Sequence, residues 1–268
     1  MTSKQSRRGV RMVEASAESG APDLTPNPEF PLATLVERRR SCEDLMVIKL
    51  EISKKFDFKP GQYCTLGLGN IERAYSIASA PYEKYLEIFV ELVPDGELTP
   101  KMFALKIGDS MSIRPRAKGL FVRDNKAHHH FMISTVTGVA PSISMVRQYL
   151  HDLKNGVNQE EHVFYVMYGA SYVDEFTYDL ELNELAERHP SIVKFVPTIS
   201  RPSESQNSEW KGVTGRVNNI VEEYLSRFNL PKDDTKVYAC GHPGMIEDVK
   251  AKLPSKGWNF AEERFWAP

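Results

Sequence analysis

The chain has 268 residues, of which 41% are hydrophobic and 26% charged, and its 34 Lys and Arg against 36 Asp and Glu give a net charge of −2. This composition is typical of a globular protein of one large or two ordinary domains. The near-neutral charge argues against general polyanion binding, and no apolar run approaches the ~18 residues of a membrane span.

Residues 1–31 differ from the rest of the chain. Basic residues open the segment and four prolines follow, without the apolar core that a secretory signal needs. The Arg and Ser content leaves a transit peptide open, although Glu14, Glu18 and Asp23 weaken that interpretation. We expect a disordered leader.

The three cysteines, Cys42, Cys64 and Cys240, are too few for a disulfide framework and too far apart for a metal or iron–sulfur set, which favours a reducing, cytoplasmic location.

Residues 32–124 consist of short segments in which polar and apolar side chains alternate. Apolar side chains recur at every second position over residues 46–52 and 86–90, as in strands with one buried face. Turn signals such as Pro60-Gly61 and Pro94-Asp95-Gly96 separate the segments. The pattern predicts an antiparallel β-barrel or sandwich, interrupted by one helix near residues 99–106.

Residues 125–268 alternate apolar strands with amphipathic helices. Strands are expected near residues 131–133, 163–168, 192–196 and 237–240, with helical periodicity over 139–153 and 217–228. Repeated βα units predict a parallel sheet covered by helices on both faces. The charge changes near the same boundary, because residues 1–123 carry a net +3 and residues 124–268 a net −5.

Five stretches carry residue types suited to nucleotide chemistry. In Arg73-Ala74-Tyr75-Ser76, an arginine fork suits a phosphate, an aromatic face suits a flat ring, and the hydroxyl suits a ring nitrogen. The sequence from Ser134 to Pro141 ends a strand and begins a helix, where open α/β sheets bind nucleotides. The other three stretches are Gly96-Glu97-Leu98-Thr99, Cys240-Gly241-His242-Pro243-Gly244-Met245 and the C-terminal Glu262-Glu263-Arg264-Phe265-Trp266.

In this order, the stretches resemble the bacterial ferredoxin (flavodoxin)–NADP reductases, from about Leu32 to Trp266. The matching elements are RAYS, VPDGELT, TVTGVAP, SRP, TGR, ACGHPGM and ERFW. The resemblance implies an FAD-binding antiparallel β-barrel over residues 32–124 and an NADP-binding α/β parallel-sheet domain over 125–268. It also implies an enzyme in which NADPH delivers a hydride to flavin N5 and the reduced FAD passes single electrons to ferredoxin or flavodoxin.

The resemblance also implies site residues. Ser76, Cys240 and Phe265 are expected at the hydride-transfer centre: Ser76 near flavin N5, Cys240 beside the hydride path, and Phe265 as a gate over the flavin. Arg201 and Arg216 are expected to hold the 2′-phosphate of NADP, and Trp266 to stack on the adenine of FAD. The remaining cofactor-binding residues are Arg73, Ala74, Tyr75, Phe89, Val90, Leu98, Thr99 and Thr137.

Three positions depart from the family pattern. Val136 stands where a glycine is usual, so either the local backbone approach differs or this side chain points away. Ser171 stands where many members carry an arginine, which predicts weaker NADP affinity or a relaxed choice between NADP and NAD. His242 replaces a more usual asparagine.

The implied partner is a separate carrier protein for a monomeric enzyme, with no nucleic-acid or membrane partner. Seven cations are candidates for docking an acidic carrier, and a purely solvated surface is an equal alternative: Lys54, Lys55, Lys59, Arg114, Arg116, Lys118 and Arg123. Two other functions stay open, the reductase component of an oxygenase or flavin-reductase system and a non-catalytic nucleotide-sensing module. We expect His128-His129-His130 to form an interdomain loop rather than a metal site, and Trp210 to cover its domain from a loop.

Overall fold

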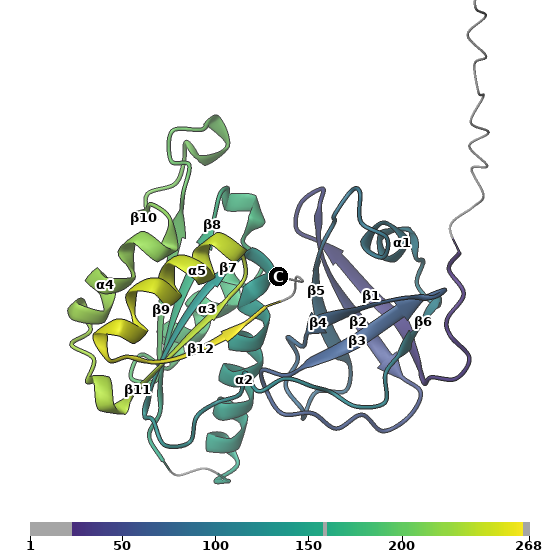
Figure 1. Cartoon of the computed structure of the whole chain (residues 1–268), viewed down its shortest axis with the longest axis horizontal. Coiled ribbons are helices and arrows are strands. Elements are labelled where there is room, and N and C mark those ends of the chain that lie inside the picture. The colour runs from purple at the N-terminus through teal and green to yellow at the C-terminus, as the bar shows by residue number, and fades with distance from the viewer. Residues whose placement is uncertain (1–22, 158–159, 265–268) are drawn as a thin grey trace, which may run out of the picture.

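The computed structural model describes residues 23–157 and 160–264 (Figure 1), which form two six-stranded sheets that lie side by side. One sheet is antiparallel and the other parallel, as predicted. No helix within these residues is long and apolar enough to cross a membrane.

The first domain is a small antiparallel barrel. Its sheet order is β4-β3-β6-β1-β2-β5, and a bridge between Ile77 and Ile88 joins the two edges. Closure of this kind removes exposed strand edges. The elements are β1 (Leu32–Arg40), β2 (Leu45–Ile52), β3 (Tyr63–Leu68), β4 (Ile71–Ser76), β5 (Leu86–Glu91), α1 (Thr99–Ala104) and β6 (Ser110–Ile113).

The apolar alternation predicted for β2 and β5 is confirmed. Met46 and Ile48 of β2 and Ile88 of β5 point into the barrel core. The opposite faces are buried as well, because Val47 and Phe89 belong to the apolar core between the barrel and the second domain. Both strands therefore lie between two cores.

The expectation of a disordered leader is wrong for residues 23–31. Leu24 packs against the barrel core, and the backbone N–H of Gly69 donates to the carbonyl of Thr25 at 2.6 Å. The guanidinium of Arg114 lies 4.5 Å from the ring centre of Phe30. The prolines suggested disorder, but this segment finds apolar and cationic partners on the barrel surface. Residues 1–22 lie outside the described part.

The second domain is a parallel sheet in the order β10-β9-β8-β7-β11-β12. Helices connect most of its strands, as in other open α/β sheets. Its elements are β7 (His129–Thr135), α2 (Ala140–Lys154), β8 (Val163–Ala170), α3 (Asp179–Arg188), β9 (Val193–Ile199), β10 (Val213–Thr214), α4 (Val217–Arg227), β11 (Thr235–Cys240), α5 (Pro243–Lys252) and β12 (Asn259–Glu263).

Helices cover both faces of this sheet. In β7, Met132 packs on the side of α2 and α3, whereas Phe131 and Ile133 pack on the side of α4 and α5. The core on the α2 side also contains Phe89 of the barrel, so α2 lies between the sheet and the barrel (Figure 1).

The expectation that residues 128–130 form an interdomain loop is wrong, because β7 begins at His129 and His130 is fully buried. The Nε2 atom of His130 lies 3.0 Å from Nδ1 of His162, and its ring stacks on Phe164. A hydrogen-bonded partner makes burial of the imidazole tolerable. No three metal-ligating side chains gather anywhere in residues 23–157 and 160–264.

Trp210 lies in a loop, as expected. Its ring stacks on Phe176 at 5.6 Å, and its Nε1–H donates to the carbonyl of Val213 at 2.9 Å. The indole therefore anchors the loop between β9 and β10 to the domain.

An arginine whose side chain is only 13% exposed connects the two domains. Arg147 of α2 donates to Glu181 of α3 through Nε and Nη2, both at 2.7 Å, and to Glu87 of β5 through Nη1 at 2.9 Å. Nη1 also approaches Glu83 of the barrel at 3.3 Å. Burial by itself lowers the pKa of Arg147, but hydrogen bonds to Glu181 and the charges of Glu87 and Glu83 raise it overall.

Replacing Arg147 with Met tests this connection. The change leaves Glu87 buried without its cation, so we expect Arg147→Met to lower the free energy of unfolding by about 3–5 kcal/mol. Arg188→Met, which removes the exposed pair with Glu184, should cost less than about 0.5 kcal/mol. Urea unfolding of both variants provides the comparison, and equal losses would contradict a special role for Arg147.

Acid should weaken the fold through its buried histidines. Burial lowers the pKa of His130 to about 3, below its ordinary value of 6.5, and also lowers the pKa of His162. Because the unfolded chain binds a proton near pH 6.5 and the folded chain does not, stability is lost as the pH falls below that value. Between pH 7 and pH 5, His130 should account for a loss of about 2 kcal/mol, which His130→Phe should remove in urea unfolding. The same pH dependence in both proteins would refute this.

Candidate active site between the barrel and the sheet

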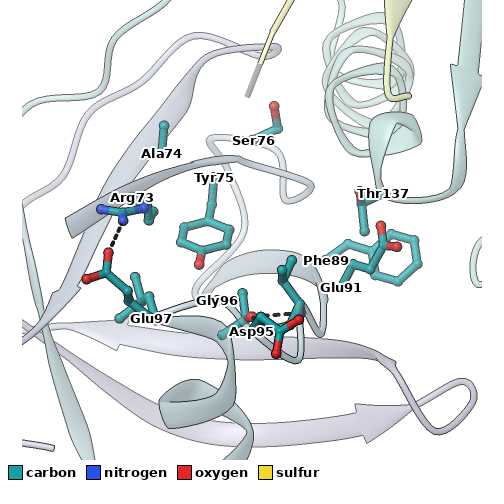
Figure 2. Close-up of a pocket in the computed structure, with 13 residues that line it drawn as sticks. Arg73, Ala74, Tyr75, Ser76, Phe89, Glu91, Asp95, Gly96, Glu97 and Thr137 are labelled. Carbon is teal, nitrogen blue, oxygen red and sulfur yellow. Dashed lines mark hydrogen bonds and ion pairs between the residues drawn. The ribbon is translucent and has the colours of Figure 1, made fainter. Parts of the chain in front are cut away.

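A cavity of about 460 Å³ opens on the barrel (Figure 2). We call it the barrel cavity. Its walls come from residues 73–76 of β4, the end of β5, the loop of residues 93–98 and the start of α1, and Thr137 closes it from the second domain. The volume lies within the range of ligand pockets, about 300–1,000 Å³.

Alternation along β4 places Arg73 and Tyr75 on the same side. The phenol ring of Tyr75 points into the cavity (Figure 2), and burial raises its pKa so that the phenol stays neutral. Arg73 Nη2 pairs with Glu97 Oε2 at 2.5 Å across the cavity rim. Ser76 is buried, and its Oγ has no hydrogen-bond partner among the described residues. Such a hydroxyl is available to a ligand.

The loop of residues 93–98 is held by Thr99. Its Oγ1 accepts from the N–H of Val93 at 2.9 Å and lies 3.3 Å from the Val93 carbonyl. Leu98, Thr99, Ala74 and Phe89 line the cavity as expected, but Val90 does not, because its side chain points into the barrel core.

A second cavity of about 680 Å³ lies at the carboxyl ends of β7, β8, β9 and β11. We call it the sheet cavity. Ser171 follows β8, Arg201 follows β9, and Arg216 precedes α4 as its N-cap residue. The fold therefore brings both expected arginines to one wall, at the edge where parallel sheets bind nucleotides. Neither arginine forms an ion pair with an acidic side chain in the described part of the chain.

The two cavities share a wall. Thr137 and Glu91 line both of them, one from the turn after β7 and the other from the end of β5. Burial and the charges of Asp44 and Glu175 raise the pKa of Glu91. Two elongated ligands, one in each cavity, would meet at this wall.

The turn after β7 keeps a glycine-like backbone despite its valine. Val136 has a φ of 43°, in the left-handed region that β-branched residues rarely adopt. Two positions on, a Cβ on Gly138 would lie 2.2 Å from the carbonyl oxygen of Cys240. The turn thus approaches the loop after β11 closely, and the N–H of His242 donates to Thr135 Oγ1 at 2.7 Å.

Comparisons with known protein families match a separate family model to each of the two domains. A model of the oxidoreductase FAD-binding domain matches residues 32–120, and one of the oxidoreductase NAD-binding domain matches residues 132–251. The flavodoxin/ferredoxin–NADP reductase of Escherichia coli is 31% identical over 205 residues, covering 72% of this chain and 77% of that protein. The ferredoxin–NADP reductase of Pseudomonas aeruginosa is 32% identical over 214 residues, covering 75% and 80%. The chain belongs to this reductase family.

Solved structures share the fold. A ferredoxin–NADP⁺ reductase from Neisseria gonorrhoeae with bound FAD and NADP superposes with a TM-score of 0.76 at 22% identity, covering 90% of this chain and 100% of that one. The ferredoxin reductase of carbazole 1,9a-dioxygenase gives 0.73 at 20% identity, covering 88% and 69%. The protein is an oxidoreductase with FAD and NADP(H) as cofactors.

The residues present in this reductase fit both cofactors. The unpartnered Ser76 hydroxyl, the inward-pointing Tyr75 ring and Arg73 offer the barrel cavity a donor, a flat apolar face and a cation. Arg201 and Arg216 offer the sheet cavity two cations suited to phosphate.

Cys240 lies beside the site rather than on its wall. Its side chain is buried in the core on the α2 side and lines neither cavity, and burial raises its pKa well above the ordinary value. The close approach of Gly138 is to the backbone of Cys240, not to its thiol. Phe265 and Trp266 lie outside the described residues.

Two acidic residues of the reductase were missed by sequence reasoning. Glu91 is the exposed last residue of β5 and lines both cavities, and Glu263 was one of several charges near the C-terminus. Glu263 ends β12 opposite Cys240, and burial raises its pKa to about 7. Only the three-dimensional neighbours of a carboxylate could have singled out either residue.

Exchanging Val136 for Gly tests whether strain is stored in the turn. Relief of left-handed strain, about 1–2 kcal/mol, should offset the lost side-chain packing, so the free energy of unfolding should change by less than about 1 kcal/mol. Val139→Gly removes a fully buried side chain at a φ of −73° and should cost about 3 kcal/mol. Urea unfolding of the two FAD-loaded variants checks this, and equal losses would contradict stored strain.

Proposed function

We propose that the protein passes electrons between NADPH and a separate one-electron carrier, ferredoxin or flavodoxin. The observation that carries the proposal is the wall of Thr137 and Glu91 shared by the barrel cavity and the sheet cavity. With FAD in the first cavity and NADP(H) in the second, this wall lets the reactive rings meet. Bound FAD supplies the redox chemistry, since it takes a hydride from NADPH and releases electrons singly.

The barrel residues bind and orient. We assign Arg73 and the loop ending at Leu98 and Thr99 to the pyrophosphate of FAD. Arg73 must then exchange its Glu97 partner for phosphate, which is a charge-assisted exchange of one anion for another. Tyr75 packs against the isoalloxazine, and the free Ser76 hydroxyl donates to its edge near N5.

The sheet residues select the nucleotide. Arg201 and Arg216 bind the 2′-phosphate, and Thr137 directs the nicotinamide toward the barrel cavity. Ser171 adds no cation, so we expect the preference for NADP over NAD to be modest. The roles that the resemblance assigns to Phe265 and Trp266 stay part of this proposal.

Three of the seven cations that the sequence offered for docking a carrier already contact other side chains of this chain. Arg114 pairs with Glu72, Lys55 pairs with Asp57, and Arg123 lies over the ring of Tyr149. Lys118 is exposed, bridges to Tyr63 at the end of β3 nearest Ser76, and precedes a fully exposed leucine, Leu120. An exposed apolar side chain close in sequence to an exposed lysine suits an acidic carrier.

An oxygenase reductase is the second candidate, because the phenol hydroxylase P5 protein of Acinetobacter pittii is 29% identical over 226 residues. The chain covers 60% of that protein, against 77% and 80% of the two NADP reductases. The better match in length favours the NADP reductase function.

A coupled assay tests the proposal. NADPH should bleach the bound flavin, and cytochrome c reduction should require added ferredoxin or flavodoxin. Lys118→Glu should lower the carrier-dependent rate about threefold to tenfold at low salt, because a rim charge acts mainly on association. Lys154→Glu, an exposed change at the end of α2, is the matched control. Bleaching without carrier-dependent turnover would refute the carrier and leave FAD and NADPH binding intact.

A further inference from the structure

Asn207 is a buried polar residue that the proposed chemistry does not use. It ends the short 3₁₀ turn Ser205–Asn207 in the loop after β9, and only 2% of it is exposed. Its side-chain amide makes three hydrogen bonds to backbone groups, two in the loop after β8 and one to Arg201 of its own loop. Oδ1 accepts from Val173 N at 2.9 Å, and Nδ2 donates to the carbonyls of Ser171 at 2.9 Å and Arg201 at 2.8 Å.

These bonds join the two loops that form one wall of the sheet cavity. Ser171 and Val173 belong to the loop after β8, and Arg201 belongs to the loop after β9. Ser171 and Arg201 line the cavity, whereas Asn207 lies behind it. The amide is therefore one of the links between the two loops, and the stack of Trp210 on Phe176 is another.

The same bonds hold the side chain that orients Arg201. Tyr172 lies between Ser171 and Val173, the two residues of the loop after β8 that Asn207 binds. Its hydroxyl accepts a hydrogen bond from Arg201 Nη1 at 2.6 Å. The guanidinium also lies 5.2 Å from the centre of the Tyr172 ring. Asn207 thus binds the backbone of Arg201 and the backbone on both sides of the aromatic ring against which the Arg201 guanidinium lies.

The loop after β9 has an anchor of its own. Trp210 stacks on Phe176 and donates to the carbonyl of Val213, and neither contact uses the Asn207 amide. Removal of the amide should therefore loosen the spacing of the two loops without detaching this loop from the domain.

We propose that Asn207 is a positioning residue that sets the preference for a 2′-phosphorylated nucleotide by holding Arg201 on the wall of the sheet cavity. This inference rests on the proposed binding of NADP(H) in that cavity. With Ser171 in place of an arginine, Arg201 and Arg216 are the two cations that line this wall, so the placement of Arg201 decides how well the 2′-phosphate is held.

The test compares NADP⁺ with NAD⁺, which lacks the 2′-phosphate. Both are titrated into the FAD-loaded protein, and flavin difference spectra give the dissociation constants. Asn207→Ala should weaken NADP⁺ binding about tenfold and NAD⁺ binding less than about twofold. Asn207→Asp keeps the acceptor for Val173 but loses both donated bonds, so it should shift the ratio in the same direction. It also replaces Asn207→Ala if that variant does not retain FAD.

Two further variants isolate the route through Arg201. Arg201→Ala should weaken NADP⁺ binding more than Asn207→Ala does, and the double variant should match Arg201→Ala within about twofold, because the two residues act as one unit. Asn155→Ala, which removes an asparagine side chain bonded to the end of α2, is the matched control and should leave the ratio unchanged.

The outcomes separate this inference from the proposed function. Equal weakening of NADP⁺ and NAD⁺ by Asn207→Ala, or additive effects in the double variant, would overturn the positioning role alone. No effect of Arg201→Ala on NADP⁺ would instead overturn the assignment of the 2′-phosphate to that arginine, and the positioning role with it.

Discussion

The largely enclosed guanidinium of Arg147 is the constraint on which the arrangement of the site depends. A charge removed from water needs several oriented acceptors. Here they come from Glu83 and Glu87 of the barrel and Glu181 of α3. Since these carboxylates belong to both domains, the ion cluster is satisfied in one relative placement of barrel and sheet. That placement buries the outer face of β5 and brings its last residue, Glu91, beside Thr137.

Close backbone approach then shapes the shared wall. The turn after β7 and the loop after β11 lie so near to one another that Gly138 has no room for a side chain. Val136 keeps a left-handed backbone in that turn. Strain of this kind persists where the surrounding structure determines the backbone, and it is common at functional sites. The result is a tightly held turn that carries Thr137 to the shared wall, with the buried Cys240 beside it.

Local patterns predicted much of the fold. Alternation in β2 and β5, helical periodicity in α2 and α4, and the strand-to-helix turns all depend on residues a few positions apart, so the sequence displays them directly. The Arg73–Ser76 stretch was also identified from its residue types, and the two arginines of the sheet cavity were predicted from the family resemblance of the ordered motifs. The burial of charged and polar groups could not be predicted from the sequence in this way. Arg147, Glu87 and Asn207 look like solvated residues of a helix, a strand and a loop, and residues 23–31 look like a continuation of the leader.

The sequence by itself determined the two-domain architecture, the class of cofactors and most of the residues facing the barrel cavity. The architecture follows from hydrophobic period and turn chemistry, which are local properties of the chain, whereas the cofactors and the cavity residues follow from the family resemblance of the ordered motifs. Only the tertiary structure decided which polar groups are desolvated: the Arg147 cluster, the His130–His162 pair, Glu263 and the amide of Asn207. Burial of such a group depends on a second surface formed by residues far away in the sequence. A local sequence pattern therefore cannot predict it.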